Sequence, residues 1–212
     1  YGTQVSITTP AFVILPNVTI GTQMWTNKNL DVRTYRNGDP IPQVTDATQW
    51  ANLTTGAWCW YNNDSATYAA TYGRLYNWYA VNDPRGLAPQ GWHVPSDEDW
   101  NKMTKYLDAS VDTTQTGWSG TTIGGSLKET GTAHWANPNT GANNSSGFSG
   151  LSSGYRYYDG TFTNLGANGI WWTSLAFDTS QAWERTLYYN YSSIYRGFVK
   201  KTWAFSVRLV RD

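Results

Sequence analysis

The last forty or so residues, 169–212, contain two apolar blocks separated by a segment with no regular period. The first block is 170–172 (IWW), and the second is 205–210 (FSVRLV), in which apolar and polar residues alternate. Short runs of β-branched and aromatic residues, and apolar residues at every second position, are typical of strands. We therefore predict two strands here. In the second strand, Phe205, Val207 and Leu209 should face one side and Ser206, Arg208 and Asp212 the other.

The segment between these blocks is rich in Tyr, Ser, Asn and Gly, most densely in 188–198 (YYNYSSIYRGF). This mixture is typical of binding loops, where Tyr supplies rigid contact area and Ser and Asn supply adaptable hydrogen bonds. Successive strand residues point to opposite faces, so the adjacent Tyr188 and Tyr189 must place at least one ring outward. Arginines next to aromatic rings are common at binding hot spots. We predict that these rings face solvent and form a ligand-binding surface with their neighbours: Trp183, Arg185, Tyr188, Tyr189, Asn190, Tyr191, Ser193, Tyr195, Arg196, Phe198 and Trp203.

Two helices are expected in the first half of the chain. Tyr and Leu recur at three- and four-residue spacing over 68–79, which predicts a helix interrupted or capped at Gly73. A second helix should begin after Ser96, which suits an N-cap and is followed by three acidic residues in the first turn. Trp100, Met103 and Leu107 would line one face of this helix.

Short strands and long loops are expected in the rest of the chain. We predict a hairpin over 18–25, a strand over 57–61 and another before the Asp-Gly turn at 159–160. Residues 108–169 are loop-rich, and residues 1–16 are either an N-terminal edge strand or a linker. The expected architecture is an α+β domain over 17–212 with two helices and short antiparallel strands joined by long loops.

Composition excludes several classes of protein. The 212 residues carry a formal net charge of zero and only 14% are charged, which argues against a basic nucleic-acid-binding surface. No apolar stretch approaches the ~20 residues of a membrane span, so we expect no membrane insertion. Aromatic residues make up 16% of the chain, more than an ordinary core needs, so some rings should be exposed. The chain begins at Tyr1, and we expect a mature or excised piece of a longer protein.

Catalytic residues are not evident. The only cysteine, Cys59, lies in an apolar run and is expected to be a small buried side chain. His93 is expected to have a packed, hydrogen-bonded structural role and His134 to be solvated in a loop. The acidic residues form no pair suited to glycoside hydrolysis. We therefore expect a non-enzymatic protein with no cofactor and no catalytic metal. A structural ion held by loop carbonyls and Asn side chains in 108–169 is left open.

A series of segments occurs in one fixed order along the chain: TYRNGDPIP (34–42), TTGAWCWYNND (54–64), YGRLYNWYAV (72–81), LAPQGWHVPSDEDW (87–100), SGFSGLSSGYR (146–156), WWTS (171–174) and FSVRLVRD (205–212). With these segments the chain resembles the Fibrobacter succinogenes major paralogous domain family over roughly 17–212. That resemblance implies a C-type lectin-like fold, a relationship to the formylglycine-generating enzyme group, and a bacterial or phage protein that is secreted or exposed at a surface.

The departures from related patterns bear on function. Many members of the family have cysteines where this chain has Ala88 and Leu209, which implies that those cysteines pair in them. Formylglycine-generating relatives require two cysteines near the C-terminal end to bind copper, and this chain lacks them. Calcium-dependent lectin-like domains commonly carry Glu-Pro-Asn or Gln-Pro-Asp followed by Trp-Asn-Asp. This chain has neither triplet, and Asn137-Pro138-Asn139 comes nearest.

The Tyr-rich segment is also similar to the diversified part of variable proteins encoded with diversity-generating retroelements. In these proteins, adenine-directed mutagenesis of Asn-type codons yields Tyr, Ser, Ile, Asp, Thr and Phe. The residues of this set in 188–198 directly precede the ending FSVRLVRD. The resemblance implies a phage receptor-binding protein or adhesin, located extracellularly, on a cell surface or on a virion, that binds a cell-surface protein or glycan. Two alternatives stay open, a structural surface module without a dedicated ligand and a degenerate relative of the formylglycine-generating enzymes.

Overall fold

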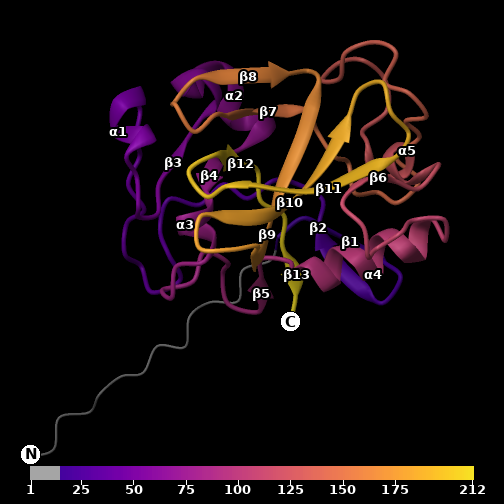
Figure 1. Ribbon diagram of the computed structural model, residues 1–212, viewed down its shortest axis with the longest axis horizontal. Coiled ribbons are helices and arrows are strands. Elements are labelled where there is room, and N and C mark those ends of the chain that lie inside the picture. The colour runs from indigo at the N-terminus through magenta and orange to yellow at the C-terminus, as the bar shows by residue number, and fades with distance from the viewer. Residues whose placement is uncertain (1–14) are drawn as a thin grey trace, which may run out of the picture.

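The structure is a computed structural model that describes residues 15–212 and has an α+β architecture (Figure 1). Within that range there are five α-helices and one 3-10 helix, where the sequence predicts two helices. Nearly all of the predicted N-terminal strand or linker, 1–16, lies outside the described residues. The helices are α1 (Ala47–Ala51), η1 (Tyr61–Asn63), α2 (Ser65–Tyr72), α3 (Trp78–Val81), α4 (Asp97–Leu107) and α5 (Ile123–Leu127).

The strands of the described residues form three antiparallel sheets, which confirms the prediction of an α+β fold with short antiparallel strands. The first sheet has the order β1 (Asn17–Ile20), β2 (Gln23–Thr26), β13 (Val210–Arg211) and β5 (Trp92–His93). The second has the order β6 (Gly117–Ser119), β11 (Ile194–Lys200), β10 (Gln181–Tyr188) and β9 (Asn168–Ala176). The third has the order β3 (Trp58–Cys59), β4 (Leu75–Asn77), β12 (Ala204–Phe205), β7 (Ser153–Arg156) and β8 (Phe162–Leu165).

The sheet β6-β11-β10-β9 is buried on both faces along much of its length. Because side chains alternate along a strand, Ile170 and Trp172 of β9 enter the apolar cluster that also contains Phe205. Trp171 points the other way, into a second cluster with Trp100 of α4 and Leu187 of β10. Helix α4 therefore covers one face of the sheet, while β7, β8 and β12 lie toward the other (Figure 1).

The helix predicted after Ser96 is confirmed as α4. The Ser96 hydroxyl accepts a hydrogen bond from the Asp99 backbone N–H at 3.1 Å, and the Asp99 carboxylate accepts one from the Ser96 backbone N–H at 2.9 Å. This reciprocal capping box satisfies N–H groups that the first turn leaves without partners. The predicted interruption or cap of the helix at Gly73 is confirmed. Helix α2 is capped by Gly73, where φ is +69°, and β4 and the short α3 follow it.

The C-terminal segment alternates as predicted, but it is two short strands rather than one. Phe205, Val207 and Leu209 enter one core cluster. Arg208 is fully buried on the opposite side and donates to the backbone carbonyls of Thr26, Phe148 and Ser149 at 2.8–3.0 Å. Burial lowers the pKa of Arg208 to about 9. The final segment is therefore anchored on both faces.

None of the helices within 15–212 has the length and hydropathy that a membrane crossing requires. Ala88 and Leu209 are buried in the same apolar cluster. The C-terminal strand of this chain is held there by packing and by its pairing with β2 and β5.

Candidate ligand-binding pocket

Strand β10 divides its side chains between two environments. Its register with β11 pairs Glu184 with Gly197 and Thr186 with Tyr195. Directly paired residues share a face of an antiparallel sheet, so Glu184, Thr186 and Tyr195 lie on one side. Arg185 pairs with Arg196 and lies on the side of α4. The predicted binding segment is therefore a hairpin with two differently occupied faces.

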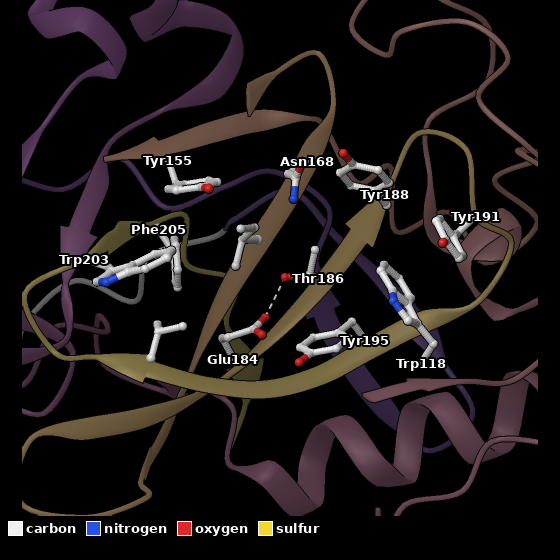
Figure 2. A pocket seen from close by; sticks show the side chains of 12 residues that line it. Trp118, Tyr155, Asn168, Glu184, Thr186, Tyr188, Tyr191, Tyr195, Trp203 and Phe205 are labelled. Carbon is white, nitrogen blue, oxygen red and sulfur yellow. Dashed lines mark hydrogen bonds between the residues drawn. The ribbon is translucent and has the colours of Figure 1, made fainter. Parts of the chain in front are cut away.

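On the face away from α4, the sheet carries a cavity of about 330 Å³ with aromatic walls (Figure 2). One group of rings comes from β6, the end of β10, the following turn and β11, and a second group comes from β7 and the segment around β12. Glu184 and Thr186 lie between the two groups, on the floor (Figure 2). The lining residues are Trp118, Tyr155, Asn168, Ile170, Glu184, Thr186, Tyr188, Tyr191, Tyr195, Val199, Trp203 and Phe205.

The first aromatic group is organised around Trp118. The Trp118 ring stacks on Tyr191, with centroids 4.4 Å apart and planes 8° apart, and meets Tyr195 edge-on at 5.2 Å. Trp118 is 41% exposed and Tyr191 is 43% exposed, so these two rings form the outer rim of the pocket. Contacts of this kind add to the stability gained from area burial and hold the rings in fixed orientations.

The second aromatic group faces the first across the floor (Figure 2). Tyr155 stacks on Trp203 with centroids 5.2 Å apart, and Trp203 also contacts Phe205 at 5.8 Å. Tyr157 packs against the outer side of this group, 4.2 Å from Trp203. Trp203 is thus fixed between other rings, which preorganises this wall.

The floor contains a buried carboxyl group. Glu184 is 3% exposed, and its Oε2 accepts a hydrogen bond from the Thr186 hydroxyl at 2.7 Å. Burial raises the pKa of Glu184 to about 7, although the Thr186 hydrogen bond and the charge of Arg185 act in the opposite direction. No lysine or arginine from the described part of the chain lines the cavity. At neutral pH the carboxyl is therefore close to the midpoint of its titration.

Lys128 stabilises the turn between β10 and β11 from the interior side of the protein. Its ammonium group is buried and donates to the carbonyls of Thr140, Tyr188 and Tyr191 at 2.8, 3.2 and 2.9 Å. Burial lowers the pKa of Lys128 to about 8. Gly124 of α5 approaches the turn so closely that a Cβ there would lie 2.4 Å from the Ser193 carbonyl oxygen. These contacts fix the rim residue Tyr191 to the protein interior.

The opposite face of the hairpin carries a network of charges. Asp97, at the start of α4, accepts hydrogen bonds from Arg185 Nη2 at 2.7 Å and Arg196 Nη2 at 2.8 Å. The Arg196 guanidinium also lies 3.9 Å from the centre of the Trp183 ring, a cation–π contact. Phe198 stacks on Phe177 at 3.7 Å beside Trp183.

The structure divides the eleven residues of the predicted surface among three places. Tyr188, Tyr191, Tyr195 and Trp203 line the pocket. Asn190, Ser193 and Tyr189 belong to the turn, where Asn190 is exposed and Tyr189 packs partly against the core that contains Leu187. Trp183, Arg185, Arg196 and Phe198 lie on the opposite face of the sheet.

The expectation that all these rings face solvent is wrong in detail. Tyr191 is exposed, whereas the rings of Trp183, Tyr188, Tyr189, Tyr195, Phe198 and Trp203 are half-buried. Arg185 is 2% exposed and fully engaged with Asp97 and Asn101, so its side chain is not part of a solvent-facing surface. The reason is the two-face alternation of a strand that has a helix packed against one side.

Several pocket residues were not predicted. Trp118 and Tyr155 come from distant parts of the sequence, and only the sheet topology brings them to the hairpin, whereas Phe205 lies in β12, shortly after β11. A signal was available for Trp118, a single aromatic residue within a polar, Gly-rich loop. A signal was available for Glu184 as well, because it is the only acidic residue between Asp178 and Asp212.

The cysteine and the two histidines considered as candidate catalytic residues have environments that indicate structural roles. Cys59 is a free, buried thiol, as predicted, and burial raises its pKa to about 12. The His93 ring nitrogens lie 2.7 Å from Asp212 and 3.3 Å from Asp99, which confirms a hydrogen-bonded position. His134 is less solvated than predicted, because its Nδ1 lies 2.7 Å from Glu129 Oε2 and its ring meets Tyr72 edge-on. Within 15–212, no group of three or more His, Cys, Asp or Glu side chains is placed to hold a metal ion.

Fold and site together define an α+β domain that presents a preorganised aromatic pocket on one face of an antiparallel sheet. The chain belongs to the Fibrobacter succinogenes major domain family, whose sequence model matches residues 18–211. Searches of the curated proteins and of the solved structures each gave no match.

Proposed function

We propose that this protein is a non-enzymatic ligand-binding domain with a C-type lectin-like fold, and that it binds its ligand in the aromatic pocket. The observation that carries the proposal is the cavity of about 330 Å³, large enough for a small ligand or the end of a larger one. Its walls are rings held by mutual contacts rather than by the ligand. Binding then requires little ordering of side chains, which favours affinity.

The proposed fold is supported by the family resemblance and by the arrangement of the chain ends. The last strand, β13, pairs with β2 near the beginning of the described chain, and irregular segments occupy most of 108–152. The last strand and an early strand of the described chain are thus paired, and the proposed ligand-binding residues lie elsewhere, on the hairpin β10–β11 and the loops beside it.

The ligand we propose is a group on a cell-surface protein or glycan of a host or neighbouring cell, which the protein meets outside the cell, on a cell surface or on a virion. Aromatic rings that combine apolar faces with polar tips suit both kinds of ligand. Tyr191 at the rim can contact the surroundings of the bound group, while the floor and the walls, which include Trp118, contact the group itself.

Ligand binding is tested with Tyr195→Ala and Trp118→Ala. Each change removes a ring that lines the pocket, and the two rings contact each other at 5.2 Å. We expect each variant to lose binding to immobilised cell-envelope proteins or glycans by about tenfold or more, as is typical of central aromatic anchors. Surface plasmon resonance measures this loss. Tyr189 is a poor probe, because its ring packs against the core.

Tyr106→Ala is the matched control, since Tyr106 is 68% exposed on α4 and does not line this pocket. Its binding should equal that of the unaltered protein. Equal binding by all three variants, or an unaltered protein that retains none of the envelope proteins and glycans, would contradict the proposal and favour a structural surface module.

The proposal includes diversification of the hairpin by a retroelement. Tyr188, Tyr191 and Tyr195 belong to the set that adenine-directed changes of Asn codons produce, and all three line the pocket. Sequencing of the neighbouring DNA tests this. We expect a reverse transcriptase gene and a near-copy of the coding region for 183–203 that differs at adenines. Flanking DNA that lacks both would contradict the diversification and leave the binding proposal intact.

A further inference from the structure

The pocket floor carries an acidic group that no positive charge of the pocket offsets. Within the described chain, the Glu184 carboxylate accepts one hydrogen bond, from Thr186, and no basic side chain lines the cavity. The nearest guanidinium in sequence, that of Arg185, lies on the other face of the sheet and binds Asp97 and Asn101. A buried carboxylate without a partner is costly, and proteins normally pair such a group.

The second carboxylate oxygen of Glu184 lies close against Gly197, the directly paired residue of β11, which has no side chain. A Cβ on Gly197 would lie 2.8 Å from Glu184 Oε1 and 2.4 Å from the Tyr195 ring. Any other residue at this position would therefore crowd both groups. The glycine therefore lets the acidic oxygen and the Tyr195 ring pack next to each other, and both residues line the cavity.

The walls around this carboxylate present π-systems. The faces of Trp and Tyr rings attract cations, most strongly where water is excluded, and rings around an acidic group are the arrangement that recognises quaternary ammonium ligands. Trp118 and Tyr195 stand on one side of Glu184, and Tyr155 and Trp203 on the other (Figure 2). A neutral apolar ligand would satisfy the rings but bury the carboxylate further. An anion would be repelled.

We propose that this pocket recognises an organic cation, a quaternary or alkylated ammonium group on a larger ligand, with Glu184 as its counter-charge and the rings of Trp118, Tyr195 and Trp203 as its walls. This inference rests on the proposed ligand-binding function and specifies the chemistry of the ligand. Two sources share this chemistry, the choline group of lipids and glycans and the side chain of a methylated lysine.

The affinity for such a ligand should depend on pH. The groups that face the Glu184 carboxyl are Thr186 and Tyr188 of β10, Tyr195 of β11, Tyr155 of β7 and uncharged side chains of β9 and β12, with Arg185 behind the sheet. None of them adds a positive charge inside the pocket. The pKa of Glu184, raised by burial to about 7, means that a cation selects the ionised form. Its affinity should rise roughly tenfold from pH 6 to pH 8.

The experiment titrates the whole protein with choline and with 3,3-dimethylbutan-1-ol, the neutral carbon isostere of choline, by isothermal calorimetry at pH 6 and pH 8. We expect choline to bind at least tenfold more tightly than the isostere at pH 8, and only choline binding to vary with pH. Glu184→Gln should lower choline affinity about tenfold and abolish the pH dependence. Glu98→Gln, which neutralises an exposed acid on α4, should change neither.

A comparison of choline with Nε-trimethyl-lysine distinguishes the two sources, since the better ligand indicates which molecule carries the group. Equal affinities of choline and its isostere would overturn cation recognition while leaving an apolar ligand pocket. No binding of choline or trimethyl-lysine would also overturn it. The proposed function fails separately, if Tyr195→Ala and Trp118→Ala leave envelope binding unchanged. The isostere comparison uses the unaltered protein, so it does not depend on the folding of a variant.

Discussion

Asp97→Asn should lower the free energy of unfolding by about 3 kcal/mol at pH 7, because it leaves a buried arginine without its counter-ion. Asp97 is buried at the start of α4 and accepts hydrogen bonds from Arg185 at 2.7 Å and from Arg196 at 2.8 Å. Arg185 is 2% exposed and cannot turn to solvent. The amide retains the shape of the side chain but removes the negative charge on which both guanidinium groups converge.

The pH dependence of this effect has a defined sign. Burial raises the pKa of Asp97, but hydrogen bonds and charges from Arg196 and Arg185 outweigh burial and hold the pKa below its usual value. A carboxyl with a lowered folded-state pKa stabilises the protein above its unfolded pKa, and this contribution is lost as the pH falls through the folded value. The difference between the variant and the unaltered protein should therefore shrink in acid.

Urea denaturation at pH 7 and at pH 3 measures both effects. Glu98→Gln is the control, since it neutralises an exposed acid in the same first turn and should change stability by no more than about 0.5 kcal/mol. A loss below 1 kcal/mol for Asp97→Asn, or a loss as large at pH 3 as at pH 7, would show that the pair with Arg185 does not hold α4 to the sheet.

Local sequence signals predicted the elements that local chemistry determines. Helix α4 could be predicted because Ser96 and Asp99 form the capping box within four residues. The hairpin of β1 and β2 could be predicted from its alternation around Gly21. The helix end at Gly73 could be predicted as well, because a glycine within the apolar stripe over 68–79 is a typical C-cap. The spacing of the aromatic residues continues past Gly73, so periodicity alone does not show that β4 follows.

Only part of the candidate site could be predicted, because composition indicates residue types but not how strands are paired. The tyrosines of the hairpin were found from composition, but composition does not give the register that places Tyr188 and Tyr195 on one face and Arg185 on the other. The second wall, Tyr155 and Trp203, depends on a sheet that joins strands distant in sequence. Contacts of this kind follow from topology, which one sequence does not reveal.

Buried lysine and arginine side chains hold together the long irregular segments whose structure could not be predicted from the sequence. Lys128, Arg156 and Arg208 are fully buried, although Lys and Arg are normally surface residues. Each donates to backbone carbonyls of irregular segments: Lys128 to the turn at Tyr191, Arg156 to Val44 and Arg208 to Phe148. Carbonyls in loops lack the partners that a helix or sheet supplies, so a multivalent donor fixes several at once. The long irregular stretches can thus support a preorganised pocket.

Glu184→Gln should make the ligand-free protein more stable at pH 8, by on the order of 2–3 kcal/mol relative to its effect at pH 4.5. Burial raises the pKa of Glu184 from 4.5 to about 7. Between these values the folded protein keeps a proton that the unfolded chain has lost, so stability falls as the pH rises. The penalty is absent below about 4.5 and complete above about 7. Glutamine carries no charge at either pH, so the variant does not suffer this loss of stability.

Urea denaturation in sodium citrate–phosphate buffer, which contains no organic cation, measures the difference at pH 4.5 and pH 8. Saturating choline should then stabilise the unaltered protein at pH 8 and narrow the gap to Glu184→Gln, because a ligand that binds only the folded state raises its stability. A gap that is the same at both pH values would contradict an unpaired, ionising Glu184. The charge that destabilises the empty pocket is the same charge that a bound cation would neutralise.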